Sequence, residues 1–195
     1  MIVSIDGIIG SGKTTQIELL KSYQAPNMQI YPEDVSNWIN EGWIDAFYDN
    51  PQKNSLGFQL RVLLSHSNID RETMKIIVTE RSSFTSAKVF GKMAWDSGPL
   101  NHHEYLLNQQ YYHKIGWKPD ILFFLDCSPE VAYNRIQSRQ RAGENKISLE
   151  YLQKLDRTYR EILSHADFEV KYINANTDEE SIQQELAQLC NSILT

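Results

Sequence analysis

The sequence contains little cysteine and none of the patterns on which cysteine-dependent folds rest. Only two cysteines occur in 195 residues, Cys127 and Cys190, far apart and outside any C-x-x-C pattern. This excludes a disulfide framework and a cysteine-based zinc site as the basis of the fold. The chain also has no internal repeat, low-complexity tract or flexible linker. We therefore expect a single domain over residues 1–195, built around one hydrophobic core.

Long apolar runs and an excess of positive charge are missing as well. No stretch is long and apolar enough to cross a bilayer, and the first residues, MIVSIDG, are not a basic region followed by an apolar run. The formal net charge is -6, so no overall field attracts nucleic acid or anionic membrane. We expect a cytoplasmic protein that binds neither, and any phosphate site must be built locally.

Short apolar runs alternate with longer segments of helical periodicity. The runs lie at Ile2–Asp6, Met28–Pro32, Lys75–Glu80, Asp120–Asp126 and Glu169–Asn174. The helical segments are Thr15–Tyr23, Phe58–Asn68, His102–Ile115, Pro129–Arg139, Leu149–His165 and Asp178–Leu194. Runs that are apolar rather than alternating, separated by helices, predict an α/β fold whose five-stranded parallel sheet is covered on both faces. Ligands of such sheets bind at the carboxyl ends of the strands.

The segment Gly7–Thr14 reads GIIGSGKT, a full match to the phosphate-loop motif G-x-x-x-x-G-K-S/T. The glycines let backbone N–H groups face the phosphates, and the N-terminus of the following helix adds partial positive charge. Lys13 would reach the β- and γ-phosphates, and the Thr14 hydroxyl would help to hold Mg²⁺. The residues expected to bind ATP here are Gly7, Gly10, Ser11, Gly12, Lys13, Thr14 and Thr15.

Further segments narrow the class of phosphate-loop protein. The N-K-x-D motif of GTPases is absent, and the chain is too short for a motor ATPase. The segments that remain informative are YPEDVSNW (Tyr31–Trp38), YDNPQKNSLGFQ (Tyr48–Gln59), ERSSFTSAKVF (Glu80–Phe90) and SPEVAYNRIQSRQRAGE (Ser128–Glu144), followed by L-x-Y-L at Leu149–Leu152. In this order they resemble the deoxynucleoside kinases, the family of deoxycytidine, deoxyguanosine and mitochondrial-type thymidine kinases.

The resemblance implies a phosphate-loop kinase that moves the γ-phosphoryl group of ATP to the 5′-hydroxyl of a deoxynucleoside, and that forms a homodimer through a helical face. Glu33 would be the general base, and Arg81 and Lys13 would stabilise the charge on the transferring phosphoryl group. Asp34 stands where the family usually has proline and offers a second carboxylate as an alternative base.

The resemblance also assigns the metal and the lid. Glu80 would contact Mg²⁺ together with Thr14. An arginine-rich lid at about residues 135–147 would close over the phosphates, with Arg139 and Arg141 as the favoured contacts.

Sugar and base recognition complete the implied site. Tyr48 and Glu144 would lie near the 3′-hydroxyl, Phe90 would stack on the base, and Trp38 would form a pocket wall. The Gln59 amide can donate and accept at once, which suits a pyrimidine edge. The rest of the pocket would be lined by Val62, His66 and Ser86. A small residue at position 86 leaves room for a 5-methyl group, which favours thymidine first and deoxycytidine second.

Two other functions stay open. LFFLDCSPEVA also resembles a stretch of thymidylate kinases, although these usually carry D-R-Y where this chain has Glu80, Arg81 and Ser82. A nucleotide-binding regulator without phosphoryl transfer would lack the base or the lid arginines, and both are present in the sequence.

Overall fold

The computed structural model describes residues 1–22, 27–71, 75–139 and 144–194. Its strands are β1 (Ile2–Asp6), β2 (Met28–Tyr31), β3 (Ile76–Glu80), β4 (Ile121–Asp126) and β5 (Glu169–Asn174). All pair in parallel in the order β2-β3-β1-β4-β5, which confirms the predicted sheet. β1 is the middle strand, with Val3 in register with Val78 on one side and with Ile121 on the other.

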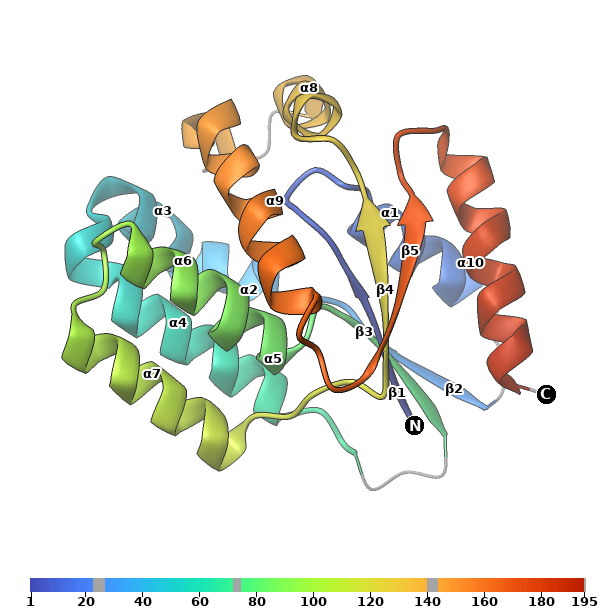
Figure 1. Cartoon of the computed structure of the whole chain (residues 1–195), viewed down its shortest axis with the longest axis horizontal. Helices are drawn as coiled ribbons and strands as arrows, with labels where there is room; N and C mark the ends of the chain where they lie inside the picture. The colour runs from blue at the N-terminus through green and yellow to red at the C-terminus, as the bar shows by residue number, and fades with distance from the viewer. Residues whose placement is uncertain (23–26, 72–74, 140–143, 195) are drawn as a thin grey trace.

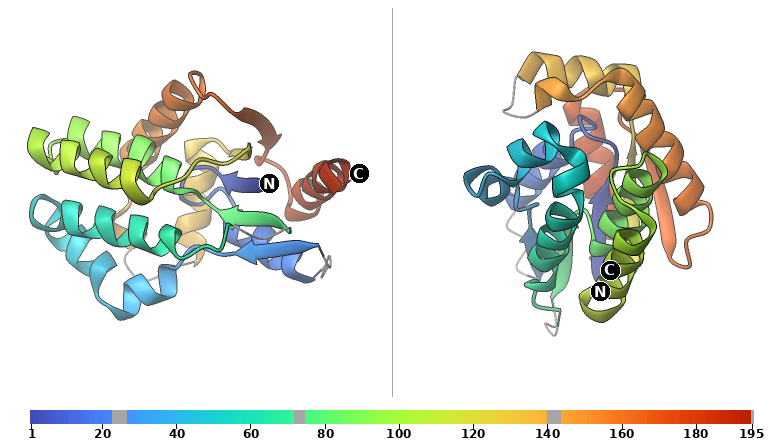
Figure 2. Two further views of the ribbon diagram at one scale, coloured as in Figure 1. Left: turned by 90° about the horizontal axis from the view of Figure 1, so that it is seen from below. Right: turned by 90° about the vertical axis from the view of Figure 1, so that its left-hand side faces the viewer.

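The helices cover both faces of this sheet. They are α1 (Lys13–Ser22), α2 (Val35–Asn40), α3 (Trp43–Asp49), α4 (Pro51–Ser67), α5 (Ser83–Thr85), α6 (Gly91–Asp96), α7 (His102–Ile115), α8 (Pro129–Arg139), α9 (Leu149–Leu163) and α10 (Glu179–Leu194). α1 and α10 lie on one face, and α4 to α7 and α9 lie on the other (Figures 1 and 2). Strands buried between two helical layers explain why most residues of β1, β3 and β4 are apolar.

The helical layer over β3 is larger than the sequence pattern predicts. α4 begins at Pro51 and not at Phe58, because the Asn50 side chain accepts a hydrogen bond from the Lys53 N–H and caps the helix, with Pro51 in its first turn. α2, α3 and the run from α5 to α6 were not predicted. The last run includes a π-helical turn over Ser86–Phe90, which changes the direction of the side chains that follow.

The carboxyl ends of the parallel strands β1, β2 and β3 lie at the same edge of the sheet, on the side toward α8 (Figure 1). Asp6, Glu80 and the loop after β2 lie at this edge, as expected for a doubly covered parallel sheet. Among the described helices, none combines the length and the apolar character that a membrane span requires.

Candidate active site

The phosphate loop joins β1 to α1 in a backbone conformation that its glycines adopt without strain. Gly10 and Gly12 have φ angles of +86° and +100°, in the left-handed region. A Cβ atom on Gly10 would lie 2.5 Å from the carbonyl oxygen of Ala132 on α8, so glycine is also required for the loop to pack there. Gly10, Gly12, Lys13 and Thr14 line the large cavity described below, whereas Gly7, Ser11 and Thr15 do not.

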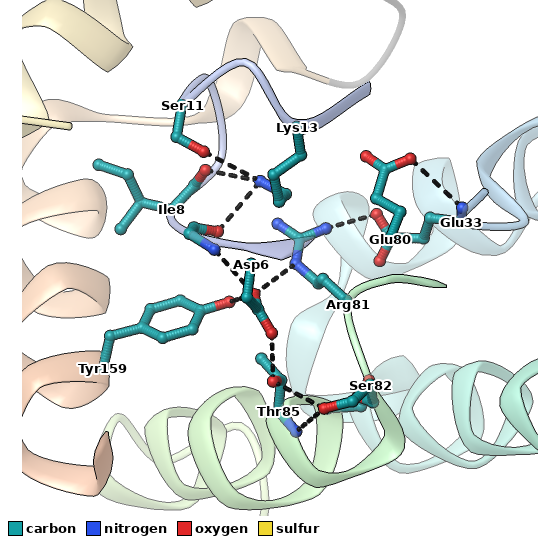
Figure 3. Close-up of polar contacts among 12 residues, drawn as sticks. Asp6, Ile8, Ser11, Lys13, Glu33, Glu80, Arg81, Ser82, Thr85 and Tyr159 are labelled. Carbon is teal, nitrogen blue, oxygen red and sulfur yellow. Dashed lines mark hydrogen bonds and ion pairs between the residues drawn. The ribbon is translucent and has the colours of Figure 1, made fainter. Parts of the chain in front are cut away.

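The Lys13 ammonium group is folded back onto the loop. It donates to the carbonyl oxygens of Gly7 (3.0 Å) and Ile8 (2.8 Å), and its side chain is buried (Figure 3). Burial, together with the positive charge of Arg81, lowers the pKa of Lys13 to about 7, although Glu80, Glu33 and Asp6 oppose the shift. Bound phosphates would supply the negative charge that keeps this ammonium group protonated.

Glu33 and Arg81 form a buried ion pair at the carboxyl ends of β2 and β3. An Arg81 guanidinium N–H donates to Glu33, and each side chain is 8% exposed (Figure 3). Burial raises the pKa of the Glu33 carboxyl, with Arg81 acting in the opposite direction. A carboxylate whose pKa is raised is a stronger proton acceptor, which suits it to take a proton from a hydroxyl group.

Arg81 is held in an unusual backbone conformation. Its φ angle is +59°, a left-handed value that is rare outside glycine and that marks local strain. The Arg81 guanidinium carbon also lies 5.0 Å from the centre of the Phe90 ring. This conformation directs the guanidinium group from the end of β3 toward the ring and the carboxylate.

A cavity of about 430 Å³ connects the phosphate loop to the far wall of the site. The sequence-predicted residues that line it are Gly10, Gly12, Lys13, Thr14, Glu33, Trp38, Tyr48, Gln59, Val62, Glu80, Arg81, Ser86, Phe90, Arg139 and Glu144. They come from segments as distant as positions 10 and 144, and the fold brings them together around one space. This volume is within the range of small-molecule sites.

The far wall of the cavity is polar at two points. Gln59 is 7% exposed, and its amide has no hydrogen-bond partner among the described residues. Ser86 donates to the carbonyl oxygen of Ser82 (3.1 Å) and contacts His66 Nε2 (3.2 Å). Gln59 therefore presents an amide donor and an amide acceptor to the cavity.

His66 lies behind this wall and does not line the large cavity. It contacts Ser86 and packs edge-on against Trp117, and burial lowers its pKa to about 4, with Arg81 acting in the same direction. The ring is therefore neutral at physiological pH. His66 can influence a ligand through Ser86 but does not face it.

Asp34, the alternative base, points away from the cavity. Its carboxylate accepts from Ser65 (3.2 Å) and Asn37 (2.6 Å) and pairs with Arg61 (3.3 Å). The geometry therefore favours Glu33 over Asp34 as the proton acceptor.

The two predicted lid and sugar residues are paired with each other. Arg139 donates from Nε (2.7 Å) and Nη2 (2.5 Å) to the two oxygens of Glu144. Arg135 is bound elsewhere: it donates to the carbonyl oxygens of Ala175 and Thr177 and fixes the loop after β5. Arg141, the other predicted phosphate contact, lies outside the described residues.

Hard oxygen ligands are available beside the phosphate loop. The Thr14 hydroxyl donates to Glu80 at 2.7 Å, and Glu80 also accepts from the Glu33 N–H. In the described part of the chain, no three His, Cys, Asp or Glu side chains are grouped closely enough to hold a metal by themselves. A hydroxyl and one carboxylate suit Mg²⁺, which usually takes its remaining ligands from water and phosphate.

Several site residues have no predicted role from the sequence. Tyr151, in the L-x-Y-L segment, lines the cavity beside Tyr48, and burial raises its pKa to about 12. Asp6, Thr85 and Tyr159 form a buried polar cluster behind Arg81 (Figure 3). The acid at the end of the first strand was visible in the sequence, but nothing in the pattern indicated its partners.

Comparison with known proteins identifies the family. A deoxynucleoside kinase family model matches residues 3–195. The deoxyadenosine kinase of Dictyostelium discoideum is 32% identical over 195 residues, covering 96% of this chain and 76% of that protein. The thymidine kinase of Ictalurid herpesvirus 1 is 24% identical over 197 residues, covering 97% and 85%.

The fold agrees with this assignment. A solved deoxyadenosine kinase from M. mycoides, with the products dCMP and dCDP bound, has a TM-score of 0.84 and 24% identity, covering 99% of this chain and 100% of that one. The alternative of a thymidylate kinase is not favoured by these matches. The chain belongs to the deoxynucleoside kinase family.

Proposed function

We propose that this deoxynucleoside kinase transfers the γ-phosphoryl group of ATP to the 5′-hydroxyl group of thymidine, with deoxycytidine as a second substrate. The observation that carries the proposal is the buried Glu33–Arg81 pair, which faces the same cavity as the phosphate loop and the Gln59 amide. Phosphoryl transfer needs a proton acceptor, a cation at the developing charge and a phosphate cradle within reach of one another.

The roles follow from these positions. Glu33 accepts the proton of the 5′-hydroxyl group as the oxygen attacks the γ-phosphorus. Arg81, which lies against Glu33, stabilises the negative charge on the phosphoryl oxygens, and Lys13 turns from its loop carbonyls to the β- and γ-phosphates. The proposal includes one domain over residues 1–195, a lid at about 135–147 to which Arg139 and Arg141 contribute, and a cytoplasmic location.

Mg²⁺ fits the oxygen ligands beside the phosphate loop. Thr14 and Glu80 would hold it, and it would neutralise charge on the β- and γ-phosphates during transfer.

The nucleoside would occupy the far end of the cavity. Gln59 would pair with the base edge, Phe90 would stack on the base, and Trp38 and Val62 would close the apolar wall. Tyr48 and Glu144 would meet the sugar. Burial raises the pKa of Tyr48, so its hydroxyl group stays protonated and can donate to a sugar oxygen.

One assay tests the reaction class and the acceptor together. ADP release is measured with ATP, Mg²⁺ and, in turn, thymidine, deoxycytidine, deoxyadenosine, deoxyguanosine, thymidine monophosphate or no acceptor. We expect release with thymidine above all others and little release without acceptor. Release that is the same with and without every nucleoside would contradict the proposal.

Deoxyadenosine is the second candidate acceptor. The supporting observation is the 32% identity to a deoxyadenosine kinase over nearly the whole chain. A higher kcat/KM for deoxyadenosine than for thymidine in the same assay would establish this alternative.

Replacing Ser86 by Asp tests the thymidine preference. The new carboxylate would crowd the 5-methyl side of thymine and could accept from the amino group of cytosine. An unpaired or crowded polar group costs about 1–3 kcal/mol, so the kcat/KM ratio of thymidine to deoxycytidine should fall by about tenfold or more. Ser86→Ala, which keeps the space open, is the matched control. An unchanged ratio in Ser86→Asp would remove the main support for thymidine.

We also propose a homodimer formed through the face of α4 and α7. The two helices pack side by side, and this part of the molecule exposes Leu64, Leu106 and Leu107. Exposed leucines on adjacent helices are typical of a surface that a partner covers. Light scattering should therefore give twice the chain mass for the wild type and the chain mass for Leu64→Asp. Tyr172→Asp, at an exposed position on β5, should remain a dimer, and a monomeric wild type would contradict the proposal.

A further inference from the structure

Asp6 at the end of β1 is a fully buried carboxylate with three hydrogen-bond donors around it. One of its oxygens accepts from the Gly7 N–H (2.8 Å) and from the Tyr159 hydroxyl (2.7 Å), and the other accepts from the Thr85 hydroxyl (Figure 3). The donors come from the phosphate loop, α9 and α5. Asp6 does not line the cavity, so the proposed chemistry gives it no contact with either substrate.

The positively charged neighbour of this carboxylate is Arg81. Asp6 Oδ1 lies 3.9 Å from Arg81 Nε, and this Nε–H is buried without a hydrogen-bond partner. The Arg81 guanidinium therefore lies between two carboxylates, Glu33 on the cavity side and Asp6 behind it (Figure 3). Burying a cation of this kind requires opposite charge nearby.

The two carboxylates differ in what the reaction does to them. When Glu33 accepts the proton of the hydroxyl group it becomes neutral, and Arg81 loses its charged partner on the cavity side. Asp6 has no access to that proton, because its oxygens face Gly7, Tyr159 and Thr85. Its attraction for Arg81 therefore persists through the step in which the Glu33 charge disappears.

We propose that Asp6 is the positioning residue of Arg81: the Asp6 carboxylate holds the Arg81 guanidinium group at the phosphoryl group while Glu33 is neutral. The hydroxyl groups of Tyr159 and Thr85 orient this carboxylate. The proposal rests on the function proposed above for Glu33 and Arg81. It gives a role to the strained backbone at Arg81: the left-handed conformation brings Nε to the buried carboxylate while the guanidinium nitrogen reaches Glu33.

The central test is Asp6→Asn. Asparagine keeps the size and one acceptor oxygen for the Gly7 N–H but removes the charge that faces Arg81. Because a small misplacement of a catalytic group can cost about 10²-fold, we expect kcat to fall by about 10- to 100-fold. The KM of the nucleoside should stay within about threefold of wild type, since its base and sugar contacts are untouched. Asp126→Asn is the matched control on the neighbouring strand, because that carboxylate pairs with Arg160 outside the cavity.

Two further measurements separate positioning from a general loss of structure. Calorimetric titration with the nucleoside counts the folded sites, and Asp6→Asn should keep the wild-type stoichiometry. In a double-mutant cycle, Asp6→Asn should lower kcat much less in an Arg81→Lys background than in the wild type, because the interaction that it removes is already lost. A merely structural role would give the same factor in both backgrounds.

Tyr159→Phe and Thr85→Val keep the test decisive if Asp6→Asn does not fold. Each removes one hydroxyl group that aims Asp6 and should lower kcat severalfold in the wild-type background but not in Arg81→Lys. If the wild type phosphorylates a deoxynucleoside, either of two results overturns the inference. One is an unchanged kcat in all of these variants, and the other is a loss of kcat that has the same size in the wild-type and the Arg81→Lys backgrounds. A wild type that phosphorylates no deoxynucleoside would instead overturn the proposed function.

Discussion

Replacing Glu33 by Gln is expected to lower kcat by about 10²- to 10⁴-fold, with a much smaller change in nucleoside affinity. Glutamine has nearly the shape of glutamate but cannot accept the proton of the 5′-hydroxyl group. The Glu33 carboxyl is buried against Arg81, whereas Asp34 is held by Ser65 and Arg61 and Glu80 accepts from the Thr14 hydroxyl. Steady-state kinetics and calorimetric titration measure the two effects separately.

Two observations accompany this result. Burial raises the pKa of Glu33, so in the wild type kcat/KM should fall with decreasing pH at values above the ordinary range of a carboxyl group, and Glu33→Gln should lose this limb of the profile. Asp34→Asn is the matched control and should retain wild-type kcat. If Asp34→Asn gives the large loss and Glu33→Gln does not, the base has been misassigned.

Lys13→Ala is expected to reduce kcat/KM by more than about 10²-fold, the cost of removing a main charge-stabilising group. Lys13 is the buried ammonium group of the phosphate loop, and among the described residues it donates only to loop atoms of Gly7, Ile8 and Ser11. These contacts are local, so the fold should survive, and circular dichroism should show the wild-type spectrum. Lys21→Ala, an exposed change on the same helix, is the matched control. Turnover near the wild-type rate in Lys13→Ala would contradict the phosphate-loop assignment.

The sheet could be predicted from sequence because its signal is local. A strand covered on both faces is apolar at most positions, so Ile2–Asp6 and Ile121–Asp126 are visible as short apolar runs. The helices between positions 35 and 50 were missed because they are short and their burial is decided by packing against each other and against α4, not by their own periodicity. Asn50 followed by Pro51 was a readable start signal for α4 that the hydrophobic pattern alone did not use.

The site was predictable to the extent that it is carried by motifs. Residues that were predicted from the phosphate loop and from the segments around Glu33 and Arg81 line one cavity. His66 was expected in the pocket but lies behind Ser86. Whether a side chain of α4 faces the cavity or lies behind its wall depends on how the helix packs, and the sequence does not show this. The Asp6 cluster could not be predicted, because its two side-chain donors, an ordinary threonine and an ordinary tyrosine, lie 79 and 153 residues away in the sequence.

The central place of β1 also bears on how the molecule reaches its native state. Val3 of β1 is in register with Val78 and with Ile121, so both strands that pair with the middle strand come from segments far along the chain. Such non-local pairing requires large loops to close, which costs chain entropy, before the stabilising contacts between strands can form. Topologies of this kind therefore fold slowly. α4 and α7 can form from local contacts while β1 is still unpaired. The phosphate loop, which begins where β1 ends, is therefore expected to be among the last parts of the molecule to assemble.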